Sequence, residues 1–303
     1  MSLHRIAFLG YGTVGRALHA LMNERGVDCE VVGIASRRGG WRAGAATCAG
    51  IDEWLATARP DVVFEAIALD PHSGEPALGY IRSSLEHGAH VVSANKGPVV
   101  HGYRELSALA ERVGRKYRFE SAVMDGAPVF SLVRECLPMA GLRAVSGVFT
   151  STATIVLEAV ESGGSVADGV AHAQALGIAE ADPSYDVDGW DSAVKLCALG
   201  NVLLGLDLRP DQVSRVGVEA VPVDEVRRAR AEGARYRLIG EVSGGGARVM
   251  MRCCTDGDPF AVSGTTLVTH FEAEVFPGGL TVTSRDPDPM TTAYGMLADY
   301  LRL

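Results

Sequence analysis

Short apolar runs alternate with amphipathic stretches along the first part of the chain. Four runs have the length and the Val, Ile and Phe content of buried strands: 5–10 (RIAFLG), 29–36 (CEVVGIAS), 61–68 (DVVFEAIA) and 89–94 (AHVVSA). Helical stretches such as EPALGYIRSSLEHG lie between them. Strands that alternate with helices predict an α/β fold with a doubly wound parallel sheet, which we expect to span residues 1–128.

The pattern changes from residue 129 onward. A helix is predicted at PVFSLVRECLP, a strand at RAVSGVF, and helical segments around 152–162 and 165–176. Three later runs alternate like antiparallel strands: ARYRLIGEVS, ARVMMRCCT and GTTLVTHFEAE. These elements predict a second domain of the α+β class over residues 129–285. We expect the last helix, within 286–303, to dock back on the first domain.

A glycine motif follows the first strand and opens the first helix. Gly10, Gly12 and Gly15 form G-x-G-x-x-G, whose glycines permit a tight turn and the approach of a pyrophosphate to free N–H groups. This strand–turn–helix context indicates a Rossmann-type dinucleotide site, to which Thr13 and Val14 also belong. The alternative is a glycine-rich turn without a ligand.

The end of the second strand bears on the choice of cofactor. NAD enzymes of this type usually carry an acidic residue there, whereas this chain has Ser36, Arg37 and Arg38. A hydroxyl and two guanidiniums suit a 2′-phosphate, because arginine offers planar, charged donors to phosphate oxygens. The sequence therefore favours NADP(H) over NAD(H). The alternative is a solvated basic loop.

Composition narrows the range of partners. The chain has 303 residues and a net charge of −9, which disfavours binding to a nucleic-acid backbone. No apolar run reaches the roughly 18 residues of a membrane span, so no membrane partner is expected. The six cysteines contain no C-x-x-C pair, which disfavours a zinc site or a disulfide framework and favours reduced thiols in the cytoplasm.

Lys96 lies in SANKGPVV, at the carboxyl end of the fourth strand. Ligands of doubly wound sheets bind at the carboxyl ends of the strands, so Ala68 and Ser93 are also expected near the cofactor. Lys96 is predicted to lie where nicotinamide and substrate meet. The alternative is an ordinary surface lysine.

A second lysine, Lys195, opens the apolar run LCALGNVLLG. An almost wholly apolar helix is usually buried, and a lysine is seldom tolerated there without a partner. Asp191, four residues earlier, shares its helix face. We interpret Lys195 as a proton-transfer group, although a surface pair is the alternative. The preceding DVDG is similar to a calcium loop, but Ser184 and Lys195 would then occupy the first and twelfth ligand positions, which disfavours calcium.

Three long stretches resemble the homoserine dehydrogenase family, in the right order: EPALGYIRSSLEHGAHVVSANKGPVV, FESAVMDGAPVF and AQALGIAEADPSYDVDGWDSAVK. The resemblance implies a short form without a regulatory ACT-type domain, with a Rossmann-type domain joined to an α+β catalytic and dimerisation domain. It implies reversible reduction of L-aspartate 4-semialdehyde to L-homoserine with a nicotinamide cofactor. A homodimer is expected on the same basis.

The resemblance also assigns roles to single residues. Lys195 is the acid–base lysine, Asp191 orients it and contacts the substrate, and Lys96 is the second active-site lysine. Glu180 matches the carboxylate that binds the substrate amino group, with Asp186 as support, and Gly177 falls where the backbone approaches the cofactor. A loop that holds a sodium ion in some members aligns with Glu120, Val123, Asp125 and Ala127.

Two segments depart from the family pattern. The family commonly has Asn-Gly-Thr-Thr-Asn where this chain reads FTSTAT (149–154), and a Gly-Ala-Gly-type turn where it reads TSRDPDPMTTAYG. The first departure supports an alternative substrate, namely a different small amino-acid aldehyde or alcohol. A second alternative is an NADP-binding regulatory protein without turnover. An acylating dehydrogenase is disfavoured because no cysteine lies in a recognisable nucleophile segment.

Overall fold

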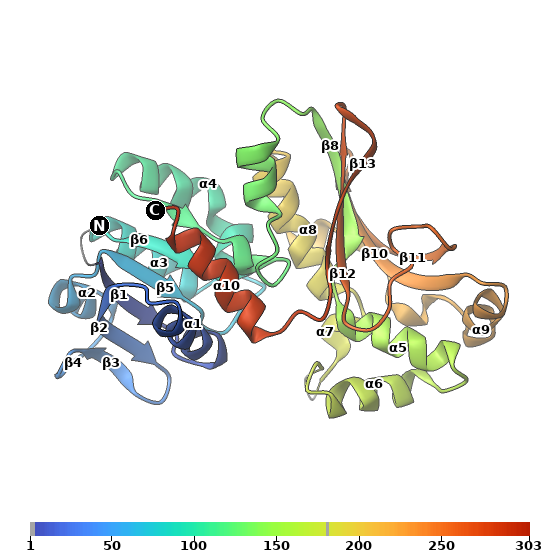
Figure 1. Ribbon diagram of the computed structural model, residues 1–303, viewed down its shortest axis with the longest axis horizontal. Helices are drawn as coiled ribbons and strands as arrows, with labels where there is room; N and C mark the ends of the chain where they lie inside the picture. The colour runs from blue at the N-terminus through green and yellow to red at the C-terminus, as the bar shows by residue number, and fades with distance from the viewer. Residues whose placement is uncertain (1–3, 180–181) are drawn as a thin grey trace. The chain divides into compact units, whose positions relative to one another are not determined.

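The computed structural model describes residues 4–179 and 182–303, and the chain divides into two compact units (Figure 1). The first unit comprises residues 1–128 together with 288–303. The second comprises residues 129–287. The return to the first unit at residue 288 comes slightly later than the expected boundary at 286.

Among the described residues of the first unit, strands form one sheet in the order β4-β3-β2-β1-β5-β6-β7. The parallel strands are β1 (His4–Leu9), β2 (Cys29–Ser36), β5 (Val62–Glu65), β6 (His90–Ser93) and β7 (Tyr117–Arg118). This confirms the predicted parallel sheet. Two antiparallel strands that the sequence reading missed extend it beyond β2, namely β3 (Gly40–Ala43) and β4 (Ala46–Cys48). They are too short and too rich in small residues to show a strand pattern.

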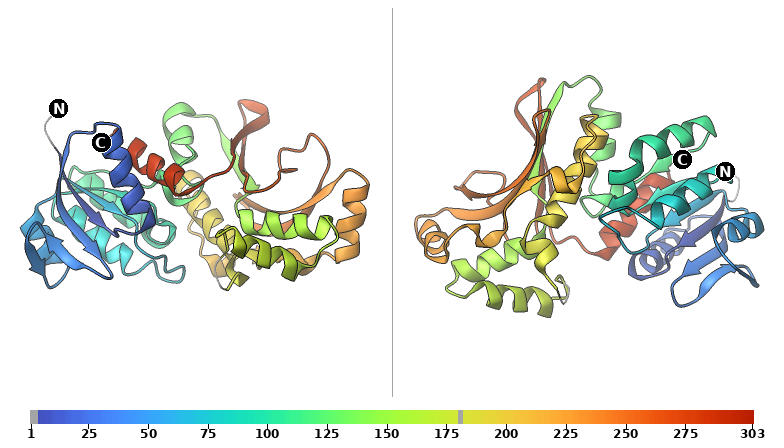
Figure 2. Two further views of the ribbon diagram at one scale, coloured as in Figure 1. Left: turned by 60° about the horizontal axis from the view of Figure 1, so that its bottom comes forward. Right: turned by 180° about the vertical axis from the view of Figure 1, so that it is seen from behind.

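The helices of the first unit enclose this sheet. They are α1 (Thr13–Glu24), α2 (Ile51–Ala58), α3 (Ala77–Glu86), α4 (Lys96–Arg112), the single turn η1 (Glu120–Ala122) and α10 (Pro289–Tyr300). Helix α10 packs beside α1, as Figures 1 and 2 show. Its Met296 and Tyr300 enter the same core as Phe8 and Phe64 of the central strands. The end of the chain thus completes the first unit.

Among the described residues of the second unit, strands form a sheet in the order β13-β12-β8-β10-β11-β9. They are β8 (Leu142–Val148), β9 (Ser214–Arg215), β10 (Arg235–Ser243), β11 (Gly246–Cys254), β12 (Leu267–Ala273) and β13 (Phe276–Ser284). All pairings are antiparallel except that of β9 with β11. Strand β13 was not predicted, because its Pro277, Gly278 and Gly279 obscure the alternation.

Helices and single turns complete the second unit: η2 (Leu132–Cys136), α5 (Ser151–Glu161), α6 (Val166–Ala175), α7 (Ser184–Val187), α8 (Trp190–Leu203), η3 (Pro210–Gln212), η4 (Val218–Ala220) and α9 (Val223–Ala231). The helix predicted at PVFSLVRECLP is helical over residues 130–136, of which η2 is a π-helical turn, and Pro138 and the following turn stop it. Helices α5 and α6 lie side by side (Figure 2).

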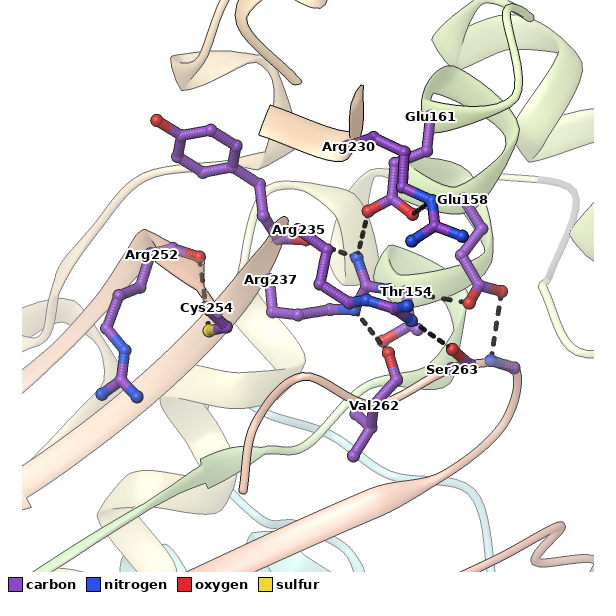
Figure 3. A network of polar contacts seen from close by, with 12 residues as sticks. Thr154, Glu158, Glu161, Arg230, Arg235, Arg237, Arg252, Cys254, Val262 and Ser263 are labelled. Carbon is purple, nitrogen blue, oxygen red and sulfur yellow. Dashed lines mark hydrogen bonds and ion pairs between the residues drawn. The ribbon is translucent and has the colours of Figure 1, made fainter. Parts of the chain in front are cut away.

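A buried arginine fixes the carboxyl end of α5 to the sheet (Figure 3). Arg237 of β10 is 0% exposed, and its guanidinium donates to Glu161 at 2.6 Å and to the carbonyl of Val262 at 2.7 Å. Glu158 is a second ion-pair partner at 3.6 Å. A buried charge with this many partners is tolerated, whereas an unpaired one would strongly destabilise the fold. The network therefore holds α5 in one position.

Candidate active site

Helix α8 carries a buried ion pair. Lys195 Nζ lies 2.8 Å from Asp191 Oδ2 one helical turn earlier, and it donates to the carbonyl oxygen of Phe149 at 2.5 Å. The two side chains are 11% and 10% exposed, so a solvated surface pair is the wrong interpretation. Gly189 begins the helix in the left-handed conformation, with φ of 80°. The apolar sequence around Lys195 buries the helix, and the two polar partners make burial of the ammonium tolerable.

The segment that departs from the family pattern supplies part of this site. Phe149 follows β8, and its carbonyl is the one that accepts from Lys195. Thr152, in the first turn of α5, donates its hydroxyl to Asp186 Oδ2 at 2.8 Å. FTSTAT therefore links the lysine to the acid-rich segment through one carbonyl and one hydroxyl. The sequence shows these hydroxyls but not their partners.

The acidic residues of the segment before α8 differ in their contacts. Asp186 lies in α7 and accepts from Thr152. Asp182 accepts from the N–H of Ser184 in an exposed local turn, and the side-chain and backbone hydrogen bonds of Ser184 lower the pKa of Asp182. Glu180, the expected ammonium-binding residue, lies outside the described residues. Over the described part of the chain, no three His, Cys, Asp or Glu side chains cluster as metal ligands.

Tyr185 is a member of the site that the sequence reading missed. Its phenol oxygen is buried and has no hydrogen-bond partner among the described residues. Burial, followed by the negative charges of Asp191 and Asp186, raises the pKa of this phenol well above its usual value. The hydroxyl therefore stays protonated and is a free donor beside two carboxylates. Its place between Ser184 and Asp186 in the sequence gives no sign of burial.

The N-terminal end of α8 is fixed by a stacked cation. The guanidinium carbon of Arg215 lies 3.7 Å from the ring centroid of Trp190, the first residue of α8. The same guanidinium donates to the carbonyl of Asp188 at 3.3 Å. Arginine over an indole ring is a favourable arrangement. It fixes the turn that precedes Asp191.

In the first unit, the three glycines of the motif serve different purposes. Gly10 has φ of 99°, and a Cβ there would lie 2.4 Å from the carbonyl oxygen of Ala66. A Cβ on Gly15 would lie 2.4 Å from the carbonyl oxygen of Gly10. A Cβ on Gly12 would meet nothing within 4 Å, so the fold itself does not require glycine there. Close approach of a pyrophosphate does require it, and the start of α1 has no side-chain cap.

The basic residues lie at the carboxyl end of β2. Ser36 ends β2 and Gly40 begins β3, so Arg37 and Arg38 occupy the exposed turn of this hairpin. The hydroxyl of Ser36 accepts from the N–H of Gly39 at 3.0 Å. The turn is adjacent to the glycine motif, because Gly10 donates its N–H to the carbonyl of Ala35. Two guanidiniums beside a pyrophosphate-binding turn fit a phosphate on the adenosine ribose.

The remaining predicted residues of the first unit lie near the ends of neighbouring strands. Ala68 is exposed after β5, and Lys96 is the half-buried first residue of α4. Ser93 is completely buried, and its hydroxyl donates to Glu65 at 2.5 Å, so this hydroxyl serves the interior of the unit. In the second unit, Gly177 follows α6 with φ of 72° and ends that helix by donating to Gln174.

The segment aligned with a sodium site has an irregular backbone. Glu120 and Val123 are buried, and the N–H of Glu120 donates to Asp299 at 2.7 Å. Asp125 has φ of 47°, and the N–H of Ala127 donates to the carbonyl of Met124. A sodium ion here stays a prediction.

A doubly wound dinucleotide-binding unit and a second unit with a buried lysine–aspartate pair define an NAD(P)-dependent oxidoreductase that acts on CH–OH groups. Residues 128–301 match the family described as homoserine dehydrogenase, and residues 10–120 match the homoserine dehydrogenase NAD-binding domain. The chain belongs to the homoserine dehydrogenase family.

Relatives and solved structures agree with this assignment. An NAD(+)-dependent homoserine dehydrogenase of Pseudomonas canavaninivorans is 31% identical, covering 100% of this chain and 97% of its own length. A homoserine dehydrogenase of Methanocaldococcus jannaschii is 30% identical, over 80% of this chain and 72% of its own. A hyperthermophilic archaeal homoserine dehydrogenase in complex with NADPH has a TM-score of 0.84 at 25% identity, over 99% of this chain and 97% of its own.

A homoserine dehydrogenase from Thiobacillus denitrificans has a TM-score of 0.87 at 25% identity, over 99% of this chain and 73% of its own. Over the residues that the structure describes, no helix is long and apolar enough to cross a bilayer.

Proposed function

We propose that the chain reversibly reduces L-aspartate 4-semialdehyde to L-homoserine with NADP(H). The buried Lys195–Asp191 pair, with the ammonium also bound by the Phe149 carbonyl, is the observation that carries this proposal. A buried cation in a fixed direction is suited to polarise a carbonyl oxygen and to give it a proton. The family relationship supports the same reaction.

Lys195 is the proton donor in this proposal. The reduced nicotinamide, when bound, supplies the hydride to the aldehyde carbon. The carbonyl oxygen then carries the electron pair of the former π bond, and Lys195 transfers a proton to that oxygen to give the alcohol. Asp191 stabilises the ammonium before transfer and fixes its direction. In the oxidation direction, neutral Lys195 takes the hydroxyl proton back.

Carboxylates of the same unit bind the substrate ammonium. Asp186, held by the Thr152 hydroxyl, and Asp191 supply negative charge on α7 and α8, and we assign Glu180 the same role. The phenol of Tyr185 remains neutral between the two aspartates and is suited to donate to the substrate carboxylate. An amino acid thus finds acceptors for its ammonium and a donor for its carboxylate.

NADP(H) is the proposed cofactor, although relatives of both kinds exist. The Pseudomonas canavaninivorans relative is NAD(+)-dependent, and the archaeal structure contains NADPH. The choice for this chain rests on its own residues, because Arg37 and Arg38 occupy the turn where a carboxylate would otherwise bind the ribose. We also propose a homodimer and a reducing, cytoplasmic setting, the latter supported by six free cysteines.

A second substrate is worth testing because of the 149–154 segment. The two family asparagine amides are absent, and a threonine hydroxyl holds Asp186 instead. A differently held carboxylate suits an amino-acid aldehyde whose length or side chain differs from aspartate semialdehyde. This alternative keeps the roles of Lys195 and Asp191.

An absorbance assay of NADPH oxidation with purified protein and L-aspartate semialdehyde tests the proposal, with NADH run beside it. Rapid oxidation that depends on the semialdehyde, with NADPH preferred, is the expected result. Turnover only with other amino-acid aldehydes would support the alternative substrate. No turnover with any aldehyde, in protein that binds NADPH, would contradict both.

A further inference from the structure

We propose that Glu65 is a positioning residue that orients Lys96 through the side chain of Asn95. The inference deepens the proposed function, because it assumes that Lys96 acts in the active site. In the sequence, Glu65 lies inside the mostly apolar strand DVVFEAIA. Its contacts, all within the first unit, connect the ends of two neighbouring strands.

Glu65 is the last residue of β5 and is 0% exposed. One carboxylate oxygen accepts from the Ser93 hydroxyl at 2.5 Å. The other accepts from the N–H of Ile67 at 2.9 Å and from the Asn95 amide nitrogen at 3.2 Å. The carboxylate therefore binds the segment after β5 and the segment after β6, at the edge of the sheet where ligands of this fold bind.

Asn95 connects the Glu65 carboxylate to the start of the helix that carries Lys96. Its amide nitrogen faces Glu65, while its amide oxygen accepts from the N–H of Gly97 at 3.0 Å and caps α4. Its own N–H donates to the hydroxyl of Ser93 at 3.0 Å. Because nitrogen and oxygen of one amide have separate partners, the amide has a single orientation. Lys96, the first residue of α4, is held between the cap and the helix.

The carboxylate of Glu65 is costly to bury. An ionisable group costs stability when buried, and burial raises the pKa of Glu65 in spite of its hydrogen bonds. An apolar residue there, like the preceding Val62, Val63 and Phe64, would avoid that cost but would leave three donors without their acceptor. The carboxylate orients the segments that flank the site, since it accepts from three donors on them. Positioning contacts of this kind govern how exactly a reacting group is held.

The test replaces Glu65 by methionine, which has similar size and no acceptor, and by glutamine, which retains an oxygen for Asn95. Asp299→Leu is the matched control, because Asp299 is also a buried carboxyl of the first unit and accepts from the N–H of Glu120. Each change is made in the natural chain and in a Lys96→Ala background. Steady-state kinetics separate kcat from the KM for NADPH.

Glu65→Met should lower kcat by about 10-fold to 100-fold, the size of effect that misplacement of a reacting group produces, with the KM for NADPH changed less than about threefold. Glu65→Gln should restore most of kcat, and Asp299→Leu should keep it. In the Lys96→Ala background, Glu65→Met should cause no further loss, because both changes act on one group.

An equal loss of kcat in the Lys96→Ala background would overturn the inference, since Glu65 would then act independently of Lys96. Wild-type kcat in a folded Glu65→Met protein would overturn it as well. If Lys96→Ala alone leaves kcat unchanged, the assigned role of Lys96 fails instead. Where Glu65→Met does not fold, Asn95→Ala breaks the same link and should give the same loss; wild-type kcat in that variant would also overturn the inference.

Discussion

Lys195 Nζ lies 2.8 Å from Asp191 Oδ2, and the two residues are four apart on a buried helix. The backbone of α8 therefore fixes the spacing of the two side chains. The carbonyl of Phe149 also accepts from the ammonium, so two acceptors of the second unit direct it.

Lys195→Ala should reduce kcat by at least about 100-fold, since general acid catalysis typically contributes that much or more. The variant should still bind NADPH, measured by the change in nicotinamide fluorescence. Asn201→Ala is the control on the same helix, because it removes a buried amide that bonds to the backbone of Leu208. Comparable turnover of the Lys195 variant and the natural chain would remove this lysine from the mechanism.

Thr152→Val and Thr152→Ser separate the hydroxyl from the shape of this side chain. Valine keeps the volume and loses the donor to Asp186, whereas serine keeps the donor. We expect valine to raise the KM for the amino-acid substrate about 10-fold, which corresponds to a hydrogen bond to a charged group of roughly 1.5 kcal/mol. Serine should stay close to wild type. Equal KM values for the two variants would show that the hydroxyl does not orient Asp186.

Tyr185→Phe should not lower the free energy of unfolding, because the hydroxyl has no partner to lose among the described residues. It should raise the KM for the amino acid. Tyr236→Phe is the contrasting control, since that hydroxyl donates to Glu225 at 2.6 Å and its loss should cost about 1 kcal/mol. Urea unfolding and steady-state kinetics give the two readouts. A large loss of stability in Tyr185→Phe would show that the phenol has a structural partner.

Replacing Arg37 and Arg38 together by alanine should raise the KM for NADPH by about 10-fold or more, with little change for NADH. The reason is that only NADPH carries the 2′-phosphate. Arg42→Ala is the matched control, because this arginine lies in the same hairpin and donates to Thr47. Equal effects on both cofactors would contradict a role in 2′-phosphate binding.

The pKa of Glu65 is raised above its usual value of 4.5, chiefly by burial. Its proton is thus held more tightly in the folded state, and the stabilisation is complete below pH 4.5 and is lost as pH rises through the folded pKa. Relative to that of Glu65→Gln, the free energy of unfolding of the natural chain should fall as pH rises from about 4 to about 7. Urea unfolding at several pH values measures this difference. A pH-independent difference would contradict the raised pKa.

The sequence by itself determined the parallel strands β1, β2, β5 and β6 of the first unit. Runs such as RIAFLG and DVVFEAIA are mostly apolar because strands of a covered parallel sheet are buried on both faces. The glycine motif was also predictable from the sequence, because the positive φ at Gly10 and the close packing at Gly15 exclude other residues. The spacing of Asp191 and Lys195 was equally readable, because one helical turn brings them together.

Tertiary structure decided the contacts between segments that are distant in the chain. Three contacts join residues many positions apart. They are the hydrogen bonds of Thr152 with Asp186, of Lys195 with the Phe149 carbonyl and of Asn95 with Glu65. No local period encodes such contacts, because they depend on which strands and helices pack together. The burial of Tyr185 has the same origin, and a polar neighbourhood in the sequence concealed it. The sequence therefore predicted which side chains could do chemistry, and the fold decided which partners hold them.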